Sequence, residues 1–192
     1  YNQNIQTLYP FHGHSKVQSL LGQGLFVLHH GNYNVSENYH AALFLIKKIF
    51  VNSPLRLILA GANASPLFSS AINRFSNIET ITNPKEDELN SLIQAAHINI
   101  LPAFQATGVK LKLINSLFLG RHCLVNKKMV QACPELKKLC FICDSDDSFK
   151  KNLTSIMSQP FTKKMKELRT KTLTNSLNNK ESGQKILEII KQ

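Results

Sequence analysis

The feature that most constrains the fold is a regular alternation of short, mostly apolar runs with longer amphipathic stretches. The predicted strands are residues 25–31, 55–61, 78–82, 98–104, 122–126 and 139–143. Strands that are apolar on both faces need cover on both faces, which is typical of a parallel sheet packed between two layers of helices. Because crossovers between parallel strands are right-handed, the sequence predicts a doubly wound, Rossmann-like α/β sandwich.

The stretches between the predicted strands carry apolar residues at helical spacing and the usual signals of a helix start. Ser36 and Ser65 are predicted N-caps, and Pro66 suits the first position of a helix. The predicted helices are residues 36–50, 65–75, 83–96 and 144–159, with one more that follows Gly108. Length and composition agree with this interpretation, since 192 residues at 43% hydrophobic content can bury the core of one domain.

The last part of the chain has a different pattern. We expect residues 163–173 to form a helix that is too polar for an interior and residues 174–183 to form a loop. Residues 181–192 are predicted to close the chain with an amphipathic helix. The apolar residues that this helix is expected to bury are Ile186, Leu187 and Ile190.

The formal net charge of +11 is unevenly distributed along the chain. Residues 1–100 hold 6 Lys+Arg against 5 Asp+Glu, whereas residues 101–192 hold 17 against 7. Such an excess indicates either a solvated lysine-rich helix face or a surface for a polyanionic ligand, an anionic membrane or nucleic acid. Aromatic residues do not interleave with the lysine run and Trp is absent, so we expect no nucleic-acid partner, while a peripheral membrane contact stays open.

The four cysteines indicate buried thiols and no metal site. Cys140 and Cys143 form a CxxC within an apolar run, where residues three apart in a strand face opposite sides. Cys123 and Cys133 do not supply a second pair at zinc-ligand spacing. Free thiols are typical of a reducing compartment, so we expect a cytoplasmic protein, with the inner face of the membrane as an open alternative.

Ligands of doubly wound sheets lie beyond the carboxyl ends of the strands, near the point where strand order reverses. The loops at these ends carry neither GxGxxG nor GK[ST], which argues against a Rossmann dehydrogenase and a P-loop NTPase. Residues 105–110 stand out instead, because Gly108 permits close backbone approach and Lys110 adds a cation to the start of a helix. Lys110 and Lys112 therefore belong either to a solvated first turn or to a site for an anion.

The stretch 96–126 resembles the donor-binding motif of the C-terminal domain of GT-B fold glycosyltransferases of the retaining, family-four bacterial type. That motif has the form A-x-v-x-v-x-P, then G-i-K-x-K-v-x-E-A, then G-x-P-v-v. The residues that stand at its positions are Pro102, Gly108, Lys110, Lys112 and Gly120. Upstream, Gly31 and Asn38 match the first loop and helix of the same domain, so the resemblance extends over residues 25–145.

The resemblance implies transfer of a glycosyl group from a nucleotide diphosphate sugar to an acceptor, with no metal and no other cofactor. In the family the lysines pair with the diphosphate, and a glutamate, here Asn115, bonds the ribose. A second acidic position is Thr107 here, and the basic pair after the first strand falls near Asn32 and Glu37. The expected donor-binding residues are Gly31, Asn32, Asn83, Gln105, Thr107, Gly108, Lys110, Lys112 and Asn115. No catalytic residue is assigned.

The resemblance also implies a domain organisation. We expect a lead-in over residues 1–24, a Rossmann-like donor-binding domain over 25–160, and C-terminal helices over 161–192 that pack back on this domain or on a missing N-terminal acceptor domain. One sheet and no initiating Met favour the C-terminal half of an enzyme of about 350 to 400 residues, inactive as an isolated fragment. The alternatives are a non-catalytic α/β nucleotide-binding or interaction module, and a basic protein that binds RNA or a membrane surface.

Overall fold

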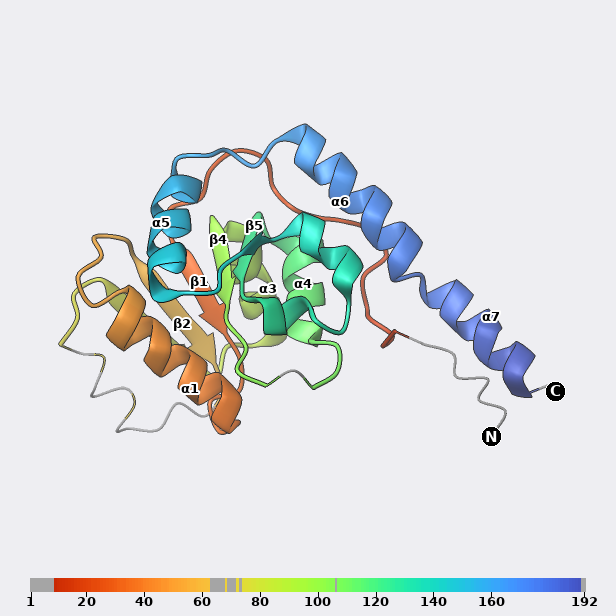
Figure 1. The fold of residues 1–192 in the computed structure, drawn as a ribbon, viewed down its shortest axis with the longest axis horizontal. Coiled ribbons are helices and arrows are strands. Elements are labelled where there is room, and N and C mark those ends of the chain that lie inside the picture. Colours follow the sequence, from red (N-terminus) through yellow and green to blue (C-terminus); the bar gives the residue numbers. More distant parts are fainter. Residues whose placement is uncertain (1–8, 63–67, 69–71, 73, 106, 191–192) are drawn as a thin grey trace.

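The computed structural model describes residues 9–62, 68, 72, 74–105 and 107–190. Six parallel strands form one sheet in the order β3-β2-β1-β4-β5-β6 (Figure 1). Their bounds are β1 Val27–His30, β2 Leu57–Gly61, β3 Ile78–Thr82, β4 Ile98–Leu101, β5 His122–Val125 and β6 Phe141–Ile142. All six predicted strands are present, although β1, β4 and β6 are each three residues shorter than predicted.

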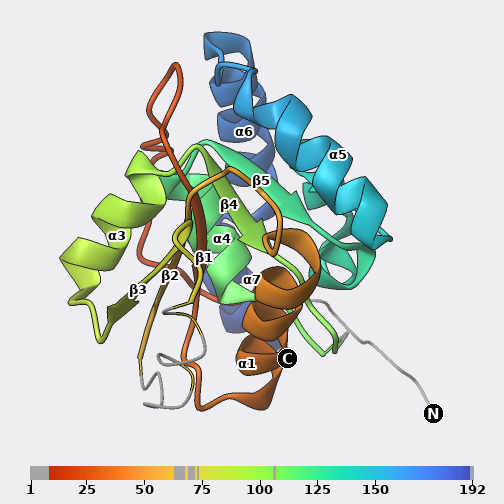
Figure 2. The same cartoon turned by 90° about the vertical axis from the view of Figure 1, so that its left-hand side faces the viewer.

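Helices cover both faces of this sheet (Figure 2). On one face lie α1 (Ser36–Phe44), its continuation η1 (Leu45–Ile49), and α5 (Asp146–Met157). On the other lie α3 (Glu86–Ala95), α4 (Leu111–Leu119) and α6 (Lys163–Ser176). The remaining helices are η2 (Lys127–Val130), η3 (Pro134–Leu139) and α7 (Asn179–Ile190).

The core confirms the doubly wound arrangement. β1, β2, β4 and β5 are buried along their whole length, because successive side chains point into two separate apolar layers. Val27 and Leu59 pack with α1 and α5, whereas Leu28 and Ile58 pack against α3. The predicted helix 65–75 lies largely outside the described residues.

Three local predictions are wrong. Ser36 is the first residue of α1 and not its cap, since Val35 holds the cap position and makes no side-chain hydrogen bond there. The expected loop 174–183 is mostly helical, because α6 runs to Ser176 and α7 begins at Asn179. No residue of α7 is buried, and its predicted core residue Ile190 is 74% exposed. The predicted helix is present, but the described part of the chain does not bury its apolar side.

The C-terminal helices do not behave alike. α6 packs against η3 and buries Arg169 and Leu173, so the prediction that it is too polar for an interior is wrong for this face. α7 continues past the body of the molecule with an exposed apolar stripe (Figure 1). The lead-in joins α6, since Gly22 and Phe161 form an antiparallel bridge. In the described part of the chain, no helix has the length and apolar character needed to cross a membrane.

The cysteines are free thiols, as predicted. Cys123, Cys133 and Cys143 are buried and Cys140 is half-buried. Burial raises the pKa of the Cys123 thiol to about 11, so this group stays protonated at neutral pH and is unreactive.

Candidate functional site

The candidate site lies at the edge of the sheet where the strand order reverses, between β1 and β4. β1 leads to α1 on one face of the sheet, and β4 leads to α4 on the other (Figure 2). The two helices therefore begin next to each other, at the ends of two adjacent strands. Ligands bind at such reversals in doubly wound sheets. We use the word crevice for the region between residues 31–35, which follow β1, and residues 102–105 and 107–110, which follow β4.

The first wall of the crevice depends on two glycines. A Cβ added at Gly61 would lie 1.8 Å from the carbonyl oxygen of Gly31, so only glycine lets the ends of β1 and β2 approach so closely. Asn38, in the first turn of α1, fits against Gly31 and donates its Nδ2 hydrogen to the carbonyl of Asn32 at 2.9 Å. Gly31 and Asn32 are therefore fixed at the end of β1 by contacts with α1.

The second wall is the loop between β4 and α4. Its first residues are held by Asn126, whose amide accepts from Ala103 N–H at 3.0 Å and donates to Ala103 O at 2.6 Å. Gly108 adopts a left-handed conformation with φ of 57°, and a side chain there would meet no atom within 4 Å. No side-chain hydrogen bond caps α4, whose cap residue is Lys110. This loop is thus anchored at one end and open beside the start of α4.

Lys110 points across the crevice to α1. Its Nζ lies 3.0 Å and 3.3 Å from the two carboxylate oxygens of Glu37 and 3.4 Å from Oγ1 of Thr107. The backbone N–H of Gln105 donates to the same Glu37 carboxylate at 3.2 Å. Since only 13% of the Lys110 side chain is exposed, this lysine is not part of a solvated first turn.

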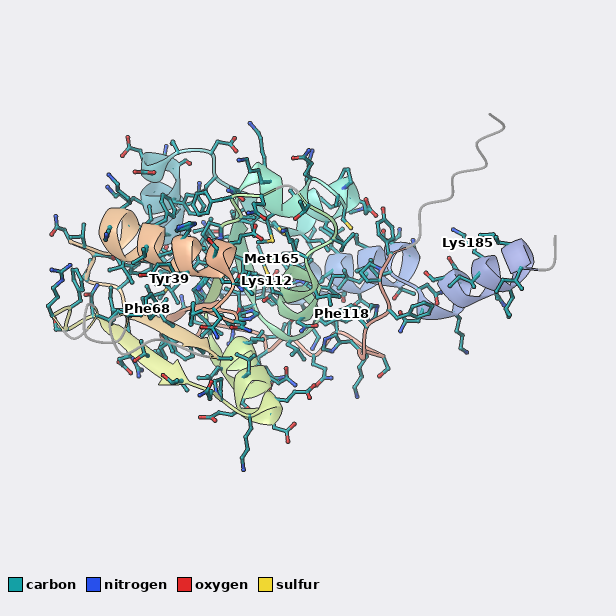
Figure 3. All side chains as sticks on the ribbon, turned by 90° about the horizontal axis from the view of Figure 1, so that it is seen from below. Tyr39, Phe68, Lys112, Phe118, Met165 and Lys185 are labelled. Atoms are coloured by element: carbon teal, nitrogen blue, oxygen red, sulfur yellow. The ribbon has the colours of Figure 1, made fainter. Side chains whose placement is uncertain are left out.

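Lys112 lies deeper, between α4 and α1 (Figure 3). Its Nζ donates to Oδ1 of Asn38. Burial lowers the pKa of Lys112 to about 8, with the Glu37 carboxylate opposing the shift and Lys110 adding to it. The ammonium is still charged at pH 7, and the hydrogen-bond acceptor that the described residues offer it is the neutral Asn38 oxygen. A cation placed in this way gains most from an additional anion.

Two buried histidines at the end of β1 lie close enough to Lys112 to feel its charge. Burial, and then the charge of Lys112, lowers the pKa of His30 to about 3, and the pKa of His29 also falls well below its usual value. His30 Nε2 pairs with Ser116 Oγ at 3.0 Å, and His29 Nδ1 lies 3.3 Å from Tyr33 Oη. Both rings are neutral at pH 7, so the charge of the crevice comes from the lysines and Glu37.

Asn115 faces a different part of the molecule. Its Oδ1 lies 3.0 Å from Nε2 of His14, which belongs to the N-terminal lead-in. The two side chains line a pocket of about 650 Å³ that also touches Glu86 and Asp87 at the start of α3. Polar side chains that line it include Gln18, Asn90 and Gln94. The contribution of His14 was not predictable, because it lies 101 residues from Asn115 in the sequence.

The predicted site residues are therefore only partly brought together. Those that surround the crevice are Gly31, Asn32, Gln105, Thr107, Gly108, Lys110 and Lys112. Asn83 lies at the same edge, but at the end of β3, two strands away from β1, where its N–H donates to Gly61 O at 2.9 Å. Asn115 lines the neighbouring pocket. The sequence did not predict that two α1 residues, Glu37 and Asn38, hold the lysines.

The described residues contain no group of three or more His, Cys, Asp or Glu side chains arranged to hold a metal ion. Apart from the single Glu37 carboxylate, the charged groups of the crevice are ammonium groups, and these bind anions together with backbone N–H groups. The chemistry of these groups therefore fits a phosphate ligand better than a metal.

No protein-family model matches the sequence, and neither does any curated protein. Several solved structures match the fold. TarM matches with a TM-score of 0.74 at 11% identity, over 99% of this chain and 40% of TarM. A mutant TarM from S. aureus, in complex with fondaparinux, α-GlcNAc-glycerol and UDP, matches with a TM-score of 0.67 at 9% identity, over 99% and 40% of the two chains.

A UDP-forming α,α-trehalose-phosphate synthase from Burkholderia xenovorans matches with a TM-score of 0.66 at 12% identity, over 88% of this chain and 44% of the synthase. This chain therefore spans less than half the length of these structures. Identities this low show the fold alone. They confirm that the chain has the Rossmann-like α/β fold found in GT-B glycosyltransferases.

Proposed function

We propose that this chain is the nucleotide-sugar donor-binding half of a GT-B glycosyltransferase, which transfers a glycosyl group to an acceptor. The observation that carries the proposal is the pair Lys110 and Lys112 at the strand-order reversal, both largely removed from solvent. A lysine is rarely withdrawn from water unless an anion meets it. The fold supports the same reading, because one neighbour of this fold holds UDP.

Each part of the crevice has a role in this proposal. Lys110 and Lys112, together with the backbone N–H groups at the uncapped start of α4, would stabilise the diphosphate as negative charge builds on the leaving group. Gly108 would let the backbone approach the donor. Asn115 would bond a ribose hydroxyl in the pocket beside His14, since a neutral amide can both donate and accept.

The acceptor site and the remaining catalytic groups would belong to an N-terminal half. In this proposal the N-terminal half would also pack against α7, because Leu187 and Ile190 of this helix are 56% and 74% exposed. Positioning of two substrates in one cleft can supply about 7 to 11 kcal/mol of barrier reduction. The 192-residue chain alone should therefore bind donor but transfer no sugar. A cytoplasmic location and a peripheral membrane contact remain part of the proposal.

A non-catalytic nucleotide-binding module is the second candidate. The observation that favours it is the acidic Glu37 beside the lysines, together with the neutral Thr107 and Asn115 at positions where the resembling family carries acidic residues. Such a module would bind nucleoside diphosphates without a preference for those that carry a sugar.

Calorimetric titration tests the proposal directly. UDP, GDP, ADP and their glucose conjugates are titrated at one salt concentration into wild type, Lys112→Ala and a control, Lys48→Ala, whose lysine is exposed on η1. One charge-assisted contact is worth about 1.5 to 3 kcal/mol, so Lys112→Ala should weaken binding roughly ten- to a hundredfold. Lys48→Ala should bind like wild type. Absence of binding for every nucleotide, or equal binding by all three proteins, would contradict the proposal.

A further inference from the structure

Glu37 is the most unusual residue of the crevice, because it places a carboxylate where the proposed ligand would place a phosphate. We infer that the Glu37 carboxylate is an internal occupant of the anion site, and that a donor diphosphate must displace it to reach Lys110. The inference rests on the proposed function, since it concerns the same site. It makes Glu37 a residue that determines how strongly the crevice accepts an anion.

The contacts of Glu37 are those of a bound anion. Lys110 Nζ lies within hydrogen-bond distance of both carboxylate oxygens, and the Gln105 backbone N–H donates to one of them at 3.2 Å. A cation combined with a loop amide is the donor set that proteins commonly offer to phosphate groups. Burial alone would raise the pKa of Glu37, but the hydrogen bonds from Lys110 and Gln105 lower it, so the carboxylate is ionised at neutral pH.

Glu37 can leave this position without disturbing the fold. It lies in the first turn of α1, and its carboxylate makes no capping bond to that helix. Its flexible side chain connects α1 to the loop 102–110 across the crevice, and 17% of it is exposed. Rotation about its side-chain bonds would carry the carboxylate to the solvent, where water replaces its partners.

Asn38 accepts a hydrogen bond from Lys112, as Glu37 does from Lys110, but its side chain is neutral. Its Oδ1 accepts from Lys112 Nζ, while its Nδ2 is bonded to the Asn32 carbonyl. Among Lys110, Lys112 and Glu37 the formal charge sums to +1. A diphosphate therefore meets a weaker positive field than two unpaired lysines would create. Its full attraction to both lysines is available only after the Glu37 carboxylate has moved away.

The experiment removes the carboxylate and measures anion binding. UDP, GDP, ADP and inorganic pyrophosphate are titrated into the wild-type chain, Glu37→Gln and Glu37→Ala. The control is Glu79→Gln, which removes a carboxylate on β3 that is paired with Arg56, the residue before β2, and so matches the change in net charge. If Glu37 competes with phosphate, both Glu37 variants should bind about ten- to a hundredfold more tightly than wild type. Glu79→Gln should change little.

Each result decides between the two proposals. Equal or weaker nucleotide and pyrophosphate binding by both Glu37 variants overturns the inference, while nucleotide binding itself leaves the proposed function standing. Tighter pyrophosphate binding by both variants, with no binding of any nucleotide, supports the inference and contradicts the proposed function. No binding of either probe to any protein overturns both. Glu37→Gln retains the shape of the side chain and serves as the second variant if Glu37→Ala fails to fold.

Discussion

Buried cations lie at both ends of the parallel strands, which we call the amino edge and the carboxyl edge of the sheet. The partners of these cations differ in kind. At the amino edge Arg169 donates to the carbonyls of Gly120 and Arg121, and Arg121 donates to carbonyls at the end of α3. At the carboxyl edge Lys110 and Lys112 donate to side chains of α1. A main-chain carbonyl cannot leave unless a strand or helix end moves, whereas a side chain can rotate away.

This difference separates a structural cation from one that is available to a ligand. Arg169 also bonds Ser19 Oγ at 2.8 Å and lies over the ring of Phe161 at 4.5 Å, so it ties the lead-in to α6. Its two carbonyl partners, Gly120 and Arg121, belong to the main chain at the start of β5. The two lysines have partners that a phosphate could replace one for one. Burial of a cation is therefore a weak sign of function until its partners are known.

The largest expected effect is a loss of stability when the buried arginine of the amino edge is replaced. Arg169→Met leaves the carbonyls of Gly120 and Arg121 buried and unpaired, which should lower the free energy of unfolding by about 3 to 4 kcal/mol. Urea titration measures this change. Lys171→Met, at an exposed position on the same helix, should stay within about 0.5 kcal/mol of wild type. Equal stability of the two variants would show that the amino edge does not depend on its arginine.

The next effect concerns His122, the first residue of β5. Burial, and less strongly the nearby His97, Arg169 and Arg121, lowers its pKa to about 4, although the Gln159 carbonyl accepts from its ring at 2.9 Å. The unfolded chain binds a proton below about pH 6.5 and the folded one does not, so stability is full above that pH and falls towards pH 4. The loss should approach about 3 kcal/mol. Urea unfolding of wild type and His122→Gln at several pH values should show a flatter profile for the variant.

A smaller effect tests the carboxyl edge in the opposite direction. Lys112→Met removes a buried ammonium that has one neutral partner, so the free energy of unfolding should stay unchanged or rise by up to about 1 kcal/mol. Nucleotide binding should nevertheless weaken roughly ten- to a hundredfold, as for Lys112→Ala. A loss of stability as large as that of Arg169→Met would remove the distinction between the two edges, because Lys112 would then be a structural residue as well.

The smallest effect concerns Asn115, whose contact with His14 is made by side chains alone. Asn115→Glu restores the acidic residue expected from the resembling family, and affinity for UDP or GDP should hold or increase by a few fold, since a carboxylate accepts more strongly than an amide. Calorimetric titration of wild type and Asn115→Glu at pH 7.5 measures the change. A tenfold loss would show that Asn115 does not face the ribose.

The fold could be predicted because its signals are local. Continuous apolar runs identified the strands, and Gly108 with its neighbouring lysines identified the loop at the crevice. The ion pair of Lys110 with Glu37 could not be predicted, because the two residues are 73 positions apart and an acidic residue in a first helical turn is already explained by the helix dipole. For the same reason, periodicity revealed the apolar face of α7 but not which surface would cover it.

The lead-in has a consequence for the order in which the chain folds. Its contacts span nearly the whole sequence: Ser19 meets Arg169 at a separation of 150 residues, and His12 meets the Leu177 carbonyl at 165. Contacts between such distant residues close last, after the sheet has formed. The lead-in should therefore be among the first segments to detach in native-state hydrogen exchange, and its detachment would open the pocket at Asn115 while the sheet stays intact. During synthesis, the lead-in cannot make these contacts until α6 and Leu177 have left the ribosome.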